Sequence, residues 1–255
     1  MNTLMGIAGQ DFVLLGGDSA FFRSVVVMDA DYRKVVELSD NILVAASGDQ
    51  GDVEMFVEWL KRHVCLMKLE SSRSVGVRAV ANLARRSLAE KLRKRGAGQS
   101  VTALLGGWDE AAGEPELFWM DALGALQKVP FGAHGLASRF ALSLLDNGYR
   151  SGMSLDEASK LMEICFQQLD NRYLVSSVGF TMKVVDKNGC RDVPRKEPPK
   201  RRHNNESRNG LGSSGEGGVD DIRGGGVSGH ALPLRAKEAA VVLPRANKAW
   251  WSQGR

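Results

Sequence analysis

The chain has 255 residues with 34 Lys and Arg against 30 Asp and Glu, a formal net charge of +4, and 43% of its residues are hydrophobic. This is the composition of a globular protein, and the length allows one large or two small domains. No apolar run reaches the roughly 18–20 residues of a membrane-spanning helix, which excludes an integral helical membrane protein. The 3 cysteines form no Cys-x-x-Cys pair and the 4 histidines lack metal-ligand spacing, so we expect reduced thiols, no metal and no cofactor.

The charge is divided unevenly along the chain. Residues 191–255 hold 13 Lys and Arg against 7 Asp and Glu, whereas residues 1–190 hold 21 against 23. The same tail contains 5 of the 7 prolines and 10 of the 29 glycines. Such a segment buries too little apolar surface to offset the entropy of ordering it. We therefore expect one domain over residues 1–193 and a disordered, basic, Gly/Pro-rich C-terminal extension over residues 194–255.

The first part of the domain predicts strands joined by short turns. Strands are expected at residues 4–8, 12–16, 24–28, 34–38 and 42–47, because short apolar runs are separated there by Gly, Asp and Asn. The pattern then changes to apolar residues at three- and four-residue intervals, which predicts two helices. Asp52 is the expected N-terminal cap of the first helix, and residues 96–98 are the expected end of the second.

The second part repeats this alternation. Strands are expected at residues 100–106, 116–120, 125–129, 179–185 and 190–193. Residues 132–135 are expected to form the turn before a third helix. A capping-box pattern at residues 154–157 predicts the start of a fourth helix, and an Asn-Gly turn predicts a hairpin between the last two strands.

The predicted order is five strands, two helices, three strands, two helices and two strands. Helices in pairs and strands in hairpins argue against a parallel sheet. Two antiparallel sheets packed face to face, each covered by a helix pair, bury every apolar face. We therefore predict an α+β fold, a four-layer αββα sandwich of two antiparallel sheets.

Six segments of the domain carry a resemblance to a known family. They are residues 12–19 (FVLLGGDS), 34–38 (KVVEL), 47–52 (SGDQGD), 104–109 (LLGGWD), 120–121 (MD) and 130–135 (PFGAHG). In this order they resemble the beta-type subunits of the 20S proteasome, over residues 1–193. The resemblance implies the N-terminal nucleophile hydrolase fold. Within the family, the start Thr3-Leu4-Met5-Gly6-Ile7 is most similar to the non-catalytic beta-4 position.

The resemblance also implies a function and partners. It implies a structural subunit of the core particle that encloses the chamber for ATP/ubiquitin-dependent protein degradation. The implied partners are other proteasome alpha and beta subunits in a stacked-ring hetero-oligomer, without membrane or nucleic acid. The implied location is the cytoplasm and nucleus.

Active members of the family need a hydroxyl nucleophile, the freed α-amine of the chain as a base, and a lysine held by an aspartate. Asp18 and Lys34 match the aspartate and lysine positions. The same spacing places Asn2 where those members have threonine, and an amide cannot attack a peptide carbonyl as a hydroxyl does. The resemblance therefore implies a vestigial site of Asn2, Asp18 and Lys34 and a catalytically inactive subunit.

Other interpretations of these residues stay open. Thr3 is the alternative nucleophile of an active threonine peptidase; it requires removal of the first two residues. It also stands one position out of register, which in a strand turns a side chain to the opposite face. Asp18 also fits a turn residue, Lys34 a solvated residue or an ion-pair partner that pins a hairpin, and His134 a turn histidine with a backbone hydrogen bond.

The tail leaves two further hypotheses. The basic cluster Lys200-Arg201-Arg202 fits a nucleic-acid or nuclear-import role, as well as a solvated extension. The apolar residues 239–243 and the Trp250-Trp251 pair fit a segment that reaches over an adjacent subunit.

Overall fold

The computed structural model describes residues 2–23, 26–94, 98–135, 138–172 and 179–194. They all belong to Met1–Pro199, the first of the two units into which the chain divides. From residue 195 onward the predicted extension lies outside the described residues, so its disorder and its two hypotheses stay predictions.

Five antiparallel strands form the first sheet, in the order β10-β1-β2-β11-β12. They are β1 (Thr3–Ala8), β2 (Phe12–Asp18), β10 (Phe131–Gly135), β11 (Phe180–Asp186) and β12 (Gly189–Asp192). The hairpins predicted at the start and at the end of the domain are confirmed. Because β10 flanks β1, a strand from the middle of the chain lies beside the first strand.

A second sheet follows the chain order β5-β6-β7-β8-β9 and is also antiparallel. Its strands are β5 (Val35–Ser39), β6 (Ile42–Gly48), β7 (Val101–Asp109), β8 (Glu114–Met120) and β9 (Leu126–Lys128). A separate two-stranded ribbon consists of β3 (Phe21–Arg23) and β4 (Val26–Asp29).

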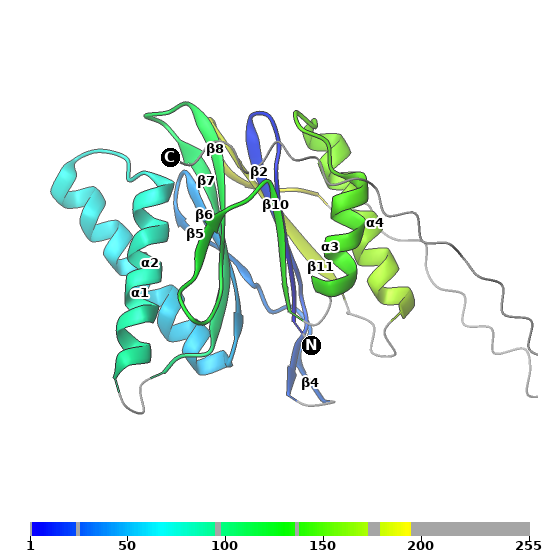
Figure 1. Ribbon diagram of the computed structural model, residues 1–255, viewed down its shortest axis with the longest axis horizontal. Coiled ribbons are helices and arrows are strands. Elements are labelled where there is room, and N and C mark those ends of the chain that lie inside the picture. Colours follow the sequence, from blue (N-terminus) through cyan, green and yellow to red (C-terminus); the bar gives the residue numbers. More distant parts are fainter. Residues whose placement is uncertain (1, 24–25, 95–97, 136–137, 173–178, 195–255) are drawn as a thin grey trace, which may run out of the picture. The chain divides into compact units, whose positions relative to one another are not determined.

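Two helix pairs cover the outer faces of the sheets (Figure 1). α1 (Gln50–Ser71) and α2 (Val77–Arg93) pack on the second sheet, whereas α3 (Ser138–Gly148) and α4 (Leu155–Arg172) pack on the first. The layer order is thus helix, sheet, sheet, helix, and the predicted αββα sandwich is confirmed. None of the described helices is long and apolar enough to cross a membrane.

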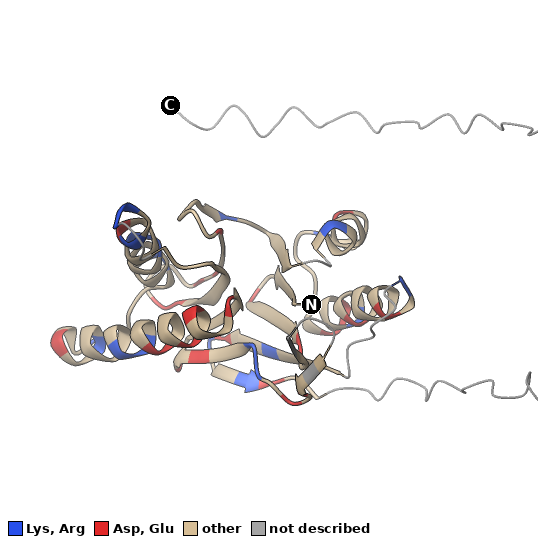
Figure 2. Cartoon of the chain, turned by 90° about the horizontal axis from the view of Figure 1, so that it is seen from below, with Lys and Arg blue, Asp and Glu red and all other residues tan. Residues whose placement is uncertain are grey.

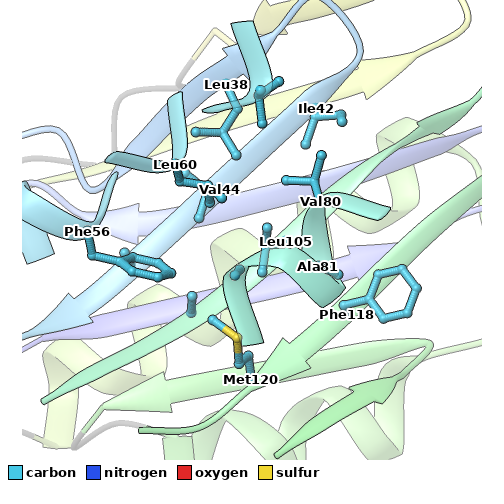
Figure 3. Packing of buried hydrophobic residues seen from close by; sticks show 14 of the residues in the cluster. Leu38, Ile42, Val44, Phe56, Leu60, Val80, Ala81, Leu105, Phe118 and Met120 are labelled. Atoms are coloured by element: carbon cyan, nitrogen blue, oxygen red, sulfur yellow. The ribbon is translucent and has the colours of Figure 1, made fainter. Parts of the chain in front are cut away.

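Three apolar layers hold the sandwich together, one between the sheets and one beneath each helix pair. Figure 3 shows the layer beneath α1 and α2, where Phe56, Leu60 and Val80 of the helices meet Leu105 and Phe118 of the second sheet. Burial of one such side chain contributes roughly 1.5–3 kcal/mol. The helices therefore stay on the sheet mainly through this layer.

Strand alternation decides which side chains of the first sheet face the second sheet. In β1, Leu4 packs in the layer between the sheets, whereas Met5 and Ile7 pack beneath α3 and α4. Successive strand residues point to opposite faces. Even-numbered residues of β1 therefore face the second sheet, and odd-numbered residues face the helices.

The strand count differs from the sequence prediction in two places. Residues 132–135 form strand β10, so the prediction of a turn there was wrong. The glycines that suggested a turn serve close packing instead: a Cβ on Gly132 would stand 3.2 Å from Leu104 and 3.3 Å from Trp119 in the opposite sheet. The strand predicted at residues 24–28 corresponds to β4, which begins at Val26, and β3 was not predicted; residues 24–25 lie outside the described residues.

The helix ends were predicted with mixed success. Asp52 does not cap α1, because the helix already begins at Gln50; its carboxylate instead accepts the backbone N–H of Ser100 at 3.0 Å. α2 ends at Arg93, before the predicted end. The capping box is confirmed, since Ser154 N–H donates to Glu157 at 3.0 Å and Glu157 N–H donates back to Ser154 at 3.4 Å.

Candidate functional site

The fold brings Asp18 and Lys34 together from different sheets. Asp18 ends β2 in the first sheet, and Lys34 directly precedes β5 in the second. The Lys34 Nζ donates to Asp18 Oδ2 at 2.5 Å and to the carbonyl oxygen of Ala20 at 2.8 Å. Both residues are almost completely buried, at 3% and 4% exposure. The ion pair that the sequence offered as one interpretation of Lys34 is confirmed, and it links the two sheets.

The other oxygen of the Asp18 carboxylate is also occupied. Oδ1 accepts the backbone N–H of Thr3 at 2.6 Å, so the pair is attached to the beginning of β1. A buried ion pair is stable only when the remaining hydrogen-bonding positions are satisfied. Both oxygens of Asp18 are engaged, by Thr3 and Lys34, and two of the three N–H donors of Lys34 are engaged, by Asp18 and Ala20.

Burial shifts the pKa values of both partners. It raises the pKa of the Asp18 carboxyl and lowers the pKa of the Lys34 ammonium from their ordinary values. The positive charge of Lys34 lowers the pKa of Asp18, and the negative charge of Asp18 raises the pKa of Lys34, so each charge opposes the effect of burial on its partner. Each charge therefore depends on the other, and removal of one leaves the other buried without compensation.

Asn2 and Thr3 lie at the start of β1, on opposite faces of the sheet. Since even-numbered residues of β1 face the second sheet, the alternation places the Asn2 position on the same side as Leu4. Thr3 falls on the side of Met5 and Ile7, facing the helices. The structure thus brings the Thr3 backbone to Asp18 but directs its side chain to the other face, as the register argument predicts.

Gly135 determines how closely β10 approaches the start of β1. It pairs with Thr3 and has a φ of +89°, a backbone conformation that residues other than glycine rarely adopt. A Cβ at this position would stand 1.7 Å from the carbonyl oxygen of Asn2. Only glycine therefore allows β10 to pair with β1 at this end of the strand, a role that the sequence alone does not indicate.

His134 lies next to this contact and is buried between the sheets. Its Nε2 is 3.1 Å from the carbonyl oxygen of Ala103, and its ring stacks on Trp119 with 4.9 Å between centroids. Burial lowers its pKa to about 4, so the ring is neutral at neutral pH. The predicted backbone hydrogen bond is confirmed, but the residue stands in strand β10 instead of in a turn.

A hollow of about 420 Å³ opens beside Lys34, between α1 and the edge of the second sheet. Its lining combines apolar side chains, including Val53 and Met55, with Tyr32 and Glu54. Met55 is 64% exposed and so does not belong to the buried stripe of α1. The three- and four-residue spacing of the buried series Val53, Phe56, Leu60 and Val64 already leaves Met55 off the buried face.

The described residues contain no group of three or more His, Cys, Asp and Glu side chains arranged to hold a metal ion. Cys165 and Cys190 are free thiols, and burial raises their pKa to about 11 and about 12. Such thiols are poor nucleophiles at neutral pH, because the thiolate is the reactive form.

Two antiparallel sheets between two helix pairs, with the first strand beginning beside a buried Lys–Asp pair, define the N-terminal nucleophile hydrolase class of fold. A family model described as "Proteasome subunit" matches residues 1–185, and the chain belongs to this family.

Curated relatives agree with this assignment. The chain is 35% identical over 193 residues to the "Probable proteasome subunit beta type-4" of Schizosaccharomyces pombe, covering 76% of this chain and 99% of that protein. It is 34% identical to the "Proteasome subunit beta type-4" of Saccharomyces cerevisiae, covering 76% and 97%. It is 35% identical over 192 residues to the "Proteasome subunit beta type-2-A" of Arabidopsis thaliana, covering 75% and 93%. The predicted resemblance to beta-type subunits is confirmed.

Proposed function

We propose that this chain is a non-catalytic, structural subunit of the proteasome core particle. The observation that carries the proposal is the residue at the position that the resemblance assigns to the nucleophile: it is Asn2, whereas the Asp18–Lys34 pair that active members also need is retained. The amide of Asn2 is not a nucleophile of the hydroxyl type, so the retained lysine has no hydroxyl to activate. In this subunit the pair works as a structural link between the two sheets.

The alternative, an active peptidase that uses Thr3, is disfavoured by two features. By strand alternation the side chain of Thr3 falls on the helix side of β1 with Met5 and Ile7, opposite to Leu4. If Thr3 were the first residue, its nitrogen would also stand 2.6 Å from the Asp18 carboxylate. An amine so close to a carboxylate is held as an ammonium ion, which is not a base.

The chain assembles with other proteasome subunits, as its family implies. We propose a position in a stacked ring of alpha and beta subunits, located in the cytoplasm and nucleus. Support comes from apolar side chains on the outside of the domain: Met55, Leu66 and Leu69 of α1 are 64%, 50% and 73% exposed. Exposed apolar residues gathered on one helix are typical of protein–protein contacts.

The proposal is tested on core particles purified with a tag on the full chain. The particles are treated with a threonine-directed covalent inhibitor, and every subunit is weighed by mass spectrometry and sequenced from its N-terminus. We expect adducts on other subunits and none on this one. An adduct on this chain, or a mature terminus at Thr3, would overturn the proposal in favour of the peptidase.

A further inference from the structure

The chain contains three Asn-Gly pairs, and the structure places two of them in different backbones. Asn188–Gly189 lies in the turn of the β11–β12 hairpin, and Asn147–Gly148 ends helix α3. The third pair, at residues 209–210, lies outside the described residues. Glycine has no side chain to obstruct a close approach of its main-chain nitrogen to a neighbouring group. The two described pairs therefore present the same reactive groups in two structural settings.

The reaction that these groups allow is deamidation of the asparagine. The main-chain nitrogen of the glycine attacks the side-chain carbonyl carbon, Cγ, and the new bond closes a cyclic imide. The bond from Cγ to the amide nitrogen breaks, and that nitrogen leaves as ammonia with the proton of the glycine N–H. Water then opens the imide at either carbonyl, which gives aspartate or isoaspartate. The reaction consumes only water, and no oxidant or reductant takes part.

Solvent access does not distinguish the two described pairs. Asn147 and Asn188 are both exposed, so water reaches both amides. The main chain distinguishes them, because ring closure requires the peptide unit that follows the asparagine to rotate toward its side chain. The backbone around each pair therefore decides which asparagine reacts.

The helical pair is held against this rotation. Asn147 and Gly148 are the last two residues of α3, and helical hydrogen bonding continues past them, since Tyr149 N–H donates to the carbonyl oxygen of Leu145 at 2.7 Å. Gly148 also packs closely on α4, where a Cβ on this residue would stand 2.4 Å from Leu161 Cδ1. Rotation of the peptide unit between Asn147 and Gly148 breaks these contacts. This pair therefore reacts only when the end of the helix opens.

The hairpin pair is less constrained. Asn188 belongs to no strand or helix, and Gly189 has a φ of +103°, far from the helical range. The backbone N–H of Asn188 donates to Asp186 Oδ1 at 2.8 Å, which fixes the peptide unit before the asparagine and not the one after it. Asp186 and Gly189 are the last paired residues of the two strands, and the end of a ladder opens at a lower cost than its middle.

We propose that Asn188 is a site of spontaneous deamidation, at which the chain acquires aspartate and isoaspartate with time, whereas Asn147 is protected by its helix. The proposal is independent of the proposed function, because the reacting groups are two neighbouring residues of the chain and water. It follows that two identical sequence motifs of one domain age at different rates.

The product changes the charge of the hairpin. Residues 186–192 contain two basic and two acidic side chains, Lys187, Arg191, Asp186 and Asp192. Figure 2 shows such charges of both signs on strands as well as on helices. A carboxylate at position 188 leaves two positive charges against three negative ones. It repels Asp186, which binds the N–H of the same residue, and competes for Arg191, which pairs with Asp186 at 2.6 Å.

Isoaspartate also lengthens the main chain of the turn, which lies against the turn between β5 and β6. A Cβ on Gly189 would stand 3.2 Å from the carbonyl oxygen of Asp40, and Cys190 Sγ lies 3.6 Å from the carbonyl oxygen of Ser39. A longer turn displaces Gly189 and Cys190 from this contact. The half-buried thiol of Cys190 then becomes accessible to reagents in solution.

The first test measures both asparagines in the same molecule. The purified full chain is kept at neutral pH and physiological temperature, and peptides that contain Asn147 and Asn188 are quantified over time by mass spectrometry. Isoaspartate is identified by enzymatic methylation with an isoaspartate methyltransferase. We expect conversion at Asn188 to be at least about ten-fold faster than at Asn147, because the helix must open first. Conversion at Asn188 that is no faster than at Asn147 overturns the proposal.

Urea provides the control for the sequence around each pair. In concentrated urea both segments are unfolded, so the two asparagines should react at similar rates. A difference that persists in urea shows that neighbouring side chains, and not the backbone of the fold, separate the two sites, and it overturns the proposal.

A pair of variants tests the effect on the hairpin contact. Asn188→Gln keeps a neutral amide but must close a larger ring, so we expect no isoaspartate at this position, whereas the matched control Asn147→Gln leaves conversion at Asn188 unchanged. Aged wild type and aged Asn147→Gln should label Cys190 with iodoacetamide roughly ten-fold faster than fresh protein, because the thiol becomes exposed. Aged Asn188→Gln should label as slowly as fresh protein. Equally fast labelling of aged Asn188→Gln overturns the proposed effect of deamidation on this contact.

Discussion

Asp18 and Glu116 are two buried carboxylates with different surroundings. Both are at most 4% exposed, and both bind cations. Asp18 uses both oxygens, and its partner Lys34 is buried as well. Glu116 receives Arg78 and Lys128 on the same oxygen at 2.9 Å, while its buried Oε2 has no hydrogen-bond partner among the described residues.

The two sites differ in the solvent exposure of the cations that bind the carboxylate. The side chains of Arg78 and Lys128 are 64% and 43% exposed, so water solvates them when the carboxylate is lost. Lys34 has no such access. Burial of the partner, more than burial of the carboxylate, therefore decides how much each ion pair matters for stability.

Replacing each of the two carboxylates by its amide tests this comparison most directly. Asp18→Asn leaves the Lys34 ammonium buried beside a neutral amide, and we expect a loss of about 3–5 kcal/mol in the free energy of unfolding. Denaturant unfolding of the full chain, followed by circular dichroism, measures this loss. The double variant Asp18→Asn/Lys34→Met removes both charges and should be less destabilised than the single one. A double variant as unstable as the single one would show that lost packing, and not the unpaired charge, causes the effect.

Acid tests the layer between the two sheets, in which His134 is buried. The pKa of His134 is about 4 in the folded chain and 6.5 in the unfolded chain, so the unfolded chain binds a proton first. Its contribution to stability is complete above pH 6.5 and is lost as the pH falls toward 4. We expect a loss of about 3 kcal/mol over this range. The measurement is the difference in unfolding free energy between the wild type and His134→Gln at several pH values. A difference that does not change with pH contradicts a neutral, buried His134.

Glu116→Gln completes the comparison with the smallest expected effect. Its two cations are partly exposed, and ion pairs of that kind contribute about 0.2–1 kcal/mol each. We expect a total loss of about 1 kcal/mol in the free energy of unfolding, measured as for Asp18→Asn. A loss as large as that of Asp18→Asn would mean that exposure of the partner does not decide the strength of these pairs.

The sequence predicted the layers, both helix pairs and the partners of the site, because these depend on periodic apolar residues and on motifs. It failed at β10, where glycines of a turn and glycines of a closely packed strand look alike. The contact of Gly135 with Asn2 and the carbonyl of Ala20 were not predictable, since both involve backbone atoms that only the tertiary structure brings together. The same holds for Asp52, whose carboxylate binds a distant backbone N–H instead of its own helix.

The contact between Gly135 and the Asn2 carbonyl also bears on which positions of the chain are free to diverge. Strand β10 contacts the start of β1 there through main-chain atoms, which are the same for every residue type. A new side chain at position 2 leaves that contact intact, whereas a new side chain at position 135 destroys it. A proteasome subunit of this architecture can therefore exchange its nucleophile and keep its shape. The residue type at position 2 and the pairing of β10 with β1 are therefore independent of each other.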